Sequence, residues 1–182
     1  RFWNPLKALT DCTNNLKQIV LAMHNFESVH TYLPYGDRLN DAHPQKVGPG
    51  VQILPFLEQS ALHSRYDWKI NWYDPGNSSV VGTKLAVFFC PSTPSGGREF
   101  NSSEGGVAFT AATSDYMPPS GIGNSEKLFL KNNYGMNIAD DKSMLTKKVK
   151  RPNRLRDTLD GLSNSIMYTE CSANPTYGAT ER

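Results

Sequence analysis

The segment closest to a catalytic motif is Gly161-Leu-Ser163-Asn-Ser165. In hydrolases with a serine at a strand-to-helix elbow, a glycine follows two residues after the serine so that the turn packs closely. Ser165 stands in that place here, and a β-rich stretch follows. A turn in which Ser163 and Asn164 bond the local backbone fits these residues better. We expect no enzyme, and a hydrolase using Ser163 ranks third among the functional hypotheses.

The same region carries oxygen donors that could suit a cation. They are Asp157, Asp160, Ser163, Asn164 and Glu170. Calcium takes about six to eight oxygen ligands, and its common loop places them at every second residue. Asp157 and Asp160 do not follow that spacing, so turn and capping roles fit them better. We expect no bound metal and no other cofactor.

The histidines and cysteines do not form a zinc pattern. His24 and His30 lie six residues apart, about 240° around a helix, so they cannot chelate one ion. The chain lacks a Cys-x-x-Cys pair. Two alternatives remain for its cysteines: a disulfide from Cys12 to Cys90, or three small buried hydrophobic side chains including Cys171.

An aromatic cluster and a basic run are the other candidate binding features. Trp68, Trp72 and Tyr73, near Asp and Asn residues, could bind a sugar, although such rings also anchor loops on a core. Residues 147–156 hold six positive charges, but acidic residues flank them and no aromatic interrupts them. With a net charge of only +2, we expect a solvated face or subunit contact and no nucleic-acid partner.

The element that must position these residues is a long N-terminal helix. Apolar side chains recur at three- and four-residue steps and predict a buried stripe of Leu9, Cys12, Leu16, Ile19, Met23 and Phe26, widened by Val20. Pro5 suits the first helical turn after a capping Asn4, and Pro34 predicts an end near His30. A helix over 5–30 would be about 39 Å long.

The remaining chain predicts shorter elements in a head formed by residues 31–182. We expect helices at 54–65 and 77–84, an aromatic loop at 66–76, and strands at 85–90, 107–113, 115–117 and 165–169. The length suits one domain over residues 1–182. The fold class is α+β, with a small antiparallel sheet packed on the long helix.

Four ordered blocks carry a family resemblance. They centre on Cys12, Asn14, Asn15 and Leu16; on Pro55, Leu57, Glu58 and Gln59; on Cys90 and Pro91; and on Asp160, Gly161, Ser163, Asn164 and Glu170. In this order they resemble the bacterial domain-of-unknown-function 1559 family. These exported pilin-like or pseudopilin-like proteins are also catalogued as type 10 extracellular solute-binding proteins. Thr93 stands where an Asp is usual in the third block.

The resemblance implies a non-catalytic, exported structural or surface-binding module. Its implied location is the cell surface or periplasm, its implied partners are other pilin-like subunits, and surface glycans are a second class of partner. Family members usually carry an upstream apolar half-helix, whereas the longest apolar run here has six residues, far below the roughly 20 of a membrane helix. We therefore expect a soluble part of a longer protein, with membrane contact only through that missing segment. The alternative is a carbohydrate- or solute-binding domain that uses the aromatic cluster.

Overall fold

The computed structural model describes residues 5–35, 38–40, 43–93, 99–119, 124–135, 144–145, 153–159 and 161–170, and it has an α+β fold. The helices are α1 (Pro5–His30), α2 (Pro49–Gln52), α3 (Ser60–His63), α4 (Ser78–Val81) and α5 (Asn124–Tyr134). The strands are β1 (Arg38–Asn40), β2 (His43–Lys46), β3 (Glu99–Glu104), β4 (Val107–Ala112), β5 (Tyr116–Met117) and β6 (Thr169–Glu170). Short 3₁₀ turns complete the order: η1 (Leu54–Leu57), η2 (Pro75–Asn77), η3 (Ala86–Phe88), η4 (Leu155–Asp157) and η5 (Leu162–Asn164).

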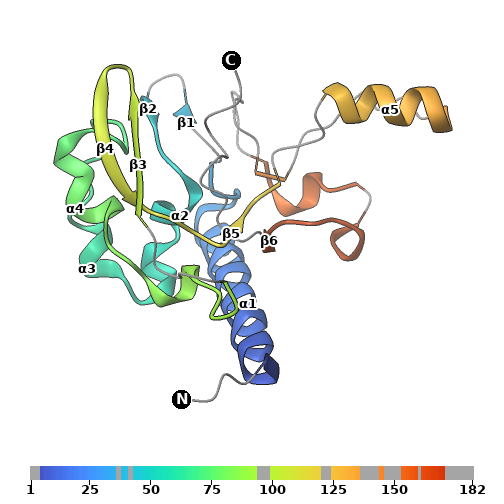
Figure 1. Cartoon of the computed structure of the whole chain (residues 1–182), viewed down its shortest axis with the longest axis horizontal. Coiled ribbons are helices and arrows are strands. Elements are labelled where there is room, and N and C mark those ends of the chain that lie inside the picture. The colour runs from blue at the N-terminus through green and yellow to red at the C-terminus, as the bar shows by residue number, and fades with distance from the viewer. Residues whose placement is uncertain are drawn as a thin grey trace.

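The long helix α1 has the predicted bounds and runs from the centre of the molecule to its lower edge in the view of Figure 1. Its end has a clear local cause. Thr31 takes a left-handed conformation with φ of 66°, and its N–H donates to the Glu27 carbonyl at 2.6 Å. Pro34, three residues later, cannot continue a helix. The predicted cap at Asn4 lies outside the described residues.

The buried face of α1 differs from the predicted stripe at its N-terminal end. The fully buried residues are Ala8, Cys12, Ile19, Ala22, Met23 and Phe26, while Leu16 and Val20 are half-buried. Leu9 was predicted to face inward, but 63% of it is exposed. Near this end, the η3 segment covers α1 on the side of Cys12 and Asn15. Leu9 lies about 60° around the helix from Cys12, beyond that narrow contact.

The strands pair antiparallel as three separate two-stranded ladders, β1–β2, β3–β4 and β5–β6. This arrangement differs from the prediction, which was one small antiparallel sheet packed against the long helix. Turns η1 and η3 supply the main surfaces that contact α1. Short irregular turns can do this because Phe56 and Leu57 in η1 and Val87 and Phe88 in η3 present apolar side chains to the helix core.

Three predicted elements are altered by local or tertiary causes. The expected helix over 54–65 divides into η1 and α3, because Glu58 adopts a left-handed conformation with φ of 61°. The expected strand over 85–90 is a 3₁₀ turn, whose flanking groups bond Asp115 rather than another strand. The expected strand over 165–169 contributes only Thr169, in β6.

The longest strand pair is a hairpin, and sequence periodicity predicted only one of its two strands. β4 was expected, but β3 is too polar to read as a buried strand. Gly105 and Gly106 connect them with φ values of 59° and 83°, the two positive angles that a tight type I′ hairpin turn requires. The hairpin lies beside α4 on the opposite side of the molecule from α5 (Figure 1).

Candidate functional site: the disulfide junction and an apolar cavity

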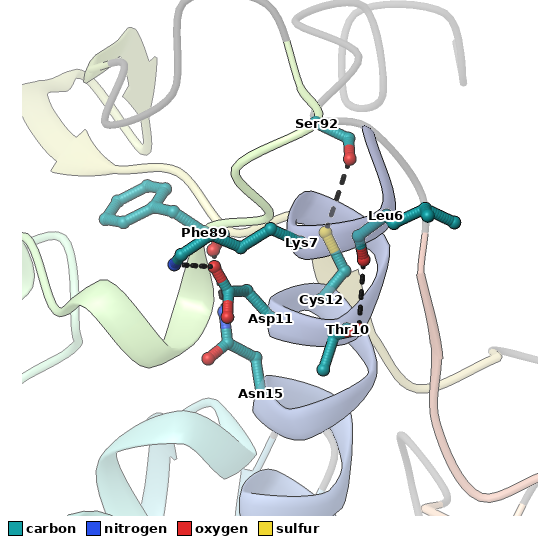
Figure 2. A network of polar contacts seen from close by, with 8 residues as sticks. All are labelled: Leu6, Lys7, Thr10, Asp11, Cys12, Asn15, Phe89 and Ser92. Carbon is teal, nitrogen blue, oxygen red and sulfur yellow. Dashed lines mark hydrogen bonds and ion pairs between the residues drawn. The ribbon is translucent and has the colours of Figure 1, made fainter. Parts of the chain in front are cut away.

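The first and third sequence blocks meet at a disulfide. Cys12 in α1 and Cys90 after η3 are bonded, with a Cα–Cα distance of 4.8 Å across a sequence separation of 78 residues. Both are buried. The Ser92 hydroxyl donates to the Cys12 Sγ at 3.7 Å (Figure 2). Of the two alternatives for these cysteines, the structure has the bonded one.

Asn15 adds a second link one helical turn further along α1. Its carboxamide N–H group donates to the Phe89 carbonyl at 2.8 Å (Figure 2). The same group approaches the Ala86 carbonyl at 3.5 Å. A side-chain donor on α1 therefore satisfies the carbonyl of Phe89, the residue that follows η3. Asn14, the adjacent block residue, is exposed.

Asp115 and Tyr116, at the start of β5, add a third set of hydrogen bonds to the junction. The Asp115 carboxylate accepts the Cys90 backbone N–H at 2.9 Å, and the Asp115 N–H donates to the Phe88 carbonyl at 2.9 Å. The Tyr116 hydroxyl donates to the Cys12 carbonyl at 3.1 Å. Tyr116 is only 1% exposed, and this burial raises the pKa of its phenol. Neither Asp115 nor Tyr116 belonged to a predicted site.

Glu170 of the fourth block reaches the same junction because β6 pairs with β5, opposite Tyr116. Its carboxylate and the sulfurs of Cys12 and Cys90 lie within 4.8 Å of one another. The sulfurs are bonded to each other, so they offer no thiolate ligands. A single exposed carboxylate then remains, and this junction is a structural link rather than a metal centre.

The rest of the fourth block forms an exposed turn. Gly161 has φ of 87°, and its carbonyl accepts the Asn164 N–H at 3.1 Å and the Ser165 hydroxyl at 3.1 Å. Ser163 is exposed on η5. The Asp157 carboxylate accepts the Arg154 N–H at 2.9 Å and caps η4. Asp160 lies outside the described residues, as do residues 147–152 of the basic run.

The second sequence block is not part of the disulfide junction. It lies where η1 packs on the C-terminal part of α1. Pro55 and Leu57 belong to η1, which packs on α1, and the rings of Phe56 and Phe26 meet edge-on at 6.0 Å. Glu58 takes the left-handed position that ends η1, and the Gln59 N–H donates to the Leu54 carbonyl at 2.9 Å. Pro91, from the third block, is exposed beside the disulfide.

The aromatic cluster packs against itself and the core. Trp68 contacts the rings of Tyr66 and His63 at 4.9 and 5.2 Å, and Trp72 meets Tyr73 edge-on at 5.6 Å. All three predicted ligand-loop residues, Trp68, Trp72 and Tyr73, are half-buried. Asn77, which no sequence pattern singled out, closes the loop. It is fully buried, accepts the Asp67 N–H at 2.8 Å and donates to two carbonyls.

Trp72 also lines an apolar cavity of about 470 Å³. Its walls come from α2, α4, η3 and the β3–β4 hairpin, and Tyr116 of the disulfide junction also lines it. The cavity therefore lies between the aromatic loop and the junction. No single sequence block signalled it, because its lining residues are spread from position 48 to position 168.

Comparison with known proteins identifies the family. A family model described as "protein of unknown function (DUF1559)" matches residues 10–182. The chain belongs to this family. Neither the search of curated proteins nor the search of solved structures found a match for this DUF1559 member. Among its described residues, no helix has both the length and the apolar character needed to cross a bilayer.

Proposed function

We propose that this DUF1559 protein is a non-catalytic, exported, pilin-like structural or surface-binding module. The observation that carries the proposal is the form of α1, whose first turns project beyond the rest of the molecule (Figure 1). Leu6 and Leu9 on those turns are 75% and 63% exposed. A 26-residue helix that is buried on one face and exposes leucines on its first turns suits a stalk that carries a head.

The disulfide supports the exported location. Structural disulfides persist in oxidising compartments and are rare in the cytosol of mesophiles. The Cys12–Cys90 disulfide links the head, residues 31–182, covalently to helix α1. The family's short name, an abbreviation of bacterial solute-binding protein, agrees with a location outside the cytoplasm.

A non-catalytic role is supported by the environment of Ser163. This residue lies on an exposed turn whose carbonyl and hydroxyl groups bond one another. A nucleophilic serine needs a base within hydrogen-bonding reach and donors for the oxyanion. We expect no ester hydrolysis above background, and Ser163→Ala should leave any residual rate unchanged.

The experiment that tests the proposal uses the gene's complete reading frame expressed in a bacterium. If the encoded protein begins with an apolar segment that continues α1, it should fractionate with the membrane or with sheared surface filaments. The matched control replaces two apolar residues of that segment by aspartate, which should release the protein. A complete protein that stays in the soluble fraction with or without those changes would refute the proposal.

The second candidate is carbohydrate or solute binding by the aromatic loop. Its specific support is Trp72, which is half-buried at the wall of the cavity. Binding to a glycan array that Trp72→Ala abolishes would place this function first. Retained binding in Trp72→Ala, or no binding at all, would count against it.

A further inference from the structure

The apolar cavity carries an inference that does not depend on whether the protein assembles. We propose that it is a binding site for a small, uncharged, mainly apolar molecule with an aromatic or branched aliphatic body. At about 470 Å³ the cavity is within the usual size range of small-molecule sites, which are concave and mostly apolar.

The wall chemistry defines the ligand class. Six aromatic side chains line the cavity: Trp72, Phe88, Phe89, Phe100, Tyr116 and Tyr168. Aliphatic side chains cover most of the remaining wall, and two of them, Leu54 and Val80, are only 3% and 4% exposed. Water in such a space finds few hydrogen-bond partners, so an apolar ligand would displace it favourably.

The polar groups of the wall are already engaged within the protein. The Ser114 hydroxyl donates to the Tyr116 carbonyl at 2.7 Å and accepts the Tyr116 N–H at 3.1 Å. The Tyr116 hydroxyl bonds the Cys12 carbonyl, and Glu99 at the rim pairs with Lys84 at 3.0 Å. A sugar would bring many hydroxyls that these groups do not meet, and burying them unpaired is unfavourable.

Small residues keep the cavity open. A Cβ atom added at Gly48 would meet no atom within 4 Å, and one added at Gly50 would approach only the Phe88 ring, at 3.8 Å. Neither glycine has a positive φ, so the backbone does not require glycine at either place. Gly50 even lies within α2, where glycine weakens a helix. On the hairpin wall, the small side chain of Ala111, on the buried face of β4, leaves room in the same way.

The cavity is held by rigid elements, which favours a preformed site. Its hairpin wall has a continuous register from Glu99↔Ala112 to Glu104↔Val107. The opposite wall follows η3, which the disulfide and Asn15 fasten to α1. Binding would then cost little reordering of the protein.

The test measures binding of the neutral fluorophore N-phenyl-1-naphthylamine to residues 1–182. We expect saturable binding at micromolar concentration, with one probe per chain, and quenching of tryptophan fluorescence because Trp72 lies at the wall. Ala111→Leu, which adds bulk on the buried face of the hairpin that also carries Phe100 and Phe109, should weaken binding at least about tenfold. Its matched control is Ala108→Leu, an exposed position on the same strand outside the cavity, which should change binding less than about twofold.

Gly50→Leu provides an independent variant on the opposite wall, with the same expected loss. Each variant is included only if it keeps the wild-type unfolding midpoint within a few degrees, so that loss of binding reports the cavity. Absence of saturable probe binding in the wild type would overturn the proposal. So would equal affinity in Ala111→Leu, Gly50→Leu and Ala108→Leu, or displacement of the probe by chitotriose rather than by naphthalene.

Discussion

At the residue scale, Ile19 shows how completely the α1 interface is closed. None of its surface is exposed, and it lies in one core with Met23, Ile53 and Tyr116. Lys17, two residues earlier, is exposed. The two positions share a helix and differ only in which side of it they occupy, so they offer a matched pair for testing the packing.

Ile19→Asp should lower the free energy of unfolding by about 4 kcal/mol or more, because it buries an unpaired carboxylate and leaves a cavity. Lys17→Asp should cost about 1 kcal/mol or less. Thermal unfolding followed by circular dichroism measures both. Equal decreases in melting temperature would show that Ile19 is not packed as described.

His63 predicts a pH dependence of stability. Burial beside Trp68 lowers the pKa of His63 below its ordinary value of 6.5. As the pH falls through 6.5, the unfolded chain therefore binds the proton before the folded chain does, and the free energy of unfolding decreases. Urea unfolding at pH 8 and pH 5 should show a larger loss for the wild type than for His63→Gln. Identical losses would contradict this assignment.

At the scale of elements, side chains rather than sheet pairing hold the irregular segments. Asp115 and Asn15 bond the backbone of η3 and its flanks, and Asn77 bonds the backbone of the aromatic loop. Gln52 does the same for the turn after α1, exchanging two hydrogen bonds with Tyr35 at 3.0 and 2.9 Å. Buried polar side chains thus replace the ladders that these segments lack.

The disulfide should contribute about 2–5 kcal/mol, since it closes a loop between residues 78 positions apart. The double variant Cys12→Ala/Cys90→Ala should lose that amount in urea unfolding. Cys171→Ala, which leaves the disulfide intact, is the control and should unfold like the wild type. A reducing agent that lowers the stability of the double variant as much as that of the wild type would show that another bond is responsible.

Asn77→Ala should cost about 2–4 kcal/mol, because it leaves the Asp67 N–H and two carbonyls without their partner in a buried site. Asn101→Ala is the comparison: Asn101 is exposed on β3 and its side chain accepts the Thr110 hydroxyl at 2.6 Å, so about 0.5 kcal/mol is expected. Equal losses in urea unfolding would mean that Asn77 does not close the loop.

At the scale of the whole molecule, the exposed apolar residues of α1 bear on assembly. Leu6, Leu21 and Val29 are more than half exposed, but Lys17 and Thr13 lie among them on the outward side. Such scattered side chains do not form the continuous patch that drives stable association in water.

Residues 1–182 should therefore be monomeric at micromolar concentration by light scattering, with the mass of 20.2 kDa that the sequence specifies. Adding an upstream apolar segment should change this. A stable oligomer of residues 1–182 that persists through dilution and added salt would show that another surface mediates assembly, and would remove the basis for assigning that role to the upstream segment.

The sequence by itself determined the features that depend on neighbours along the chain. Helix α1 could be placed because apolar spacing, Pro5 and Pro34 act within a few residues of one another. The family could be recognised because four blocks keep their order. Strand β4 and a short helix beginning near Asn77 could also be predicted, because their sequence patterns are local.

Only the tertiary structure decided which distant residues meet. Cys12 has two potential cysteine partners in the sequence, and the fold brings Cys90 to it. The strand-like run at 85–90 became a turn because Asp115, 25 residues beyond Cys90, bonds its backbone in place of a strand. The cavity could not be read from sequence for the same reason: its walls are separated along the chain, and the volume between them depends on packing distances that no local pattern encodes.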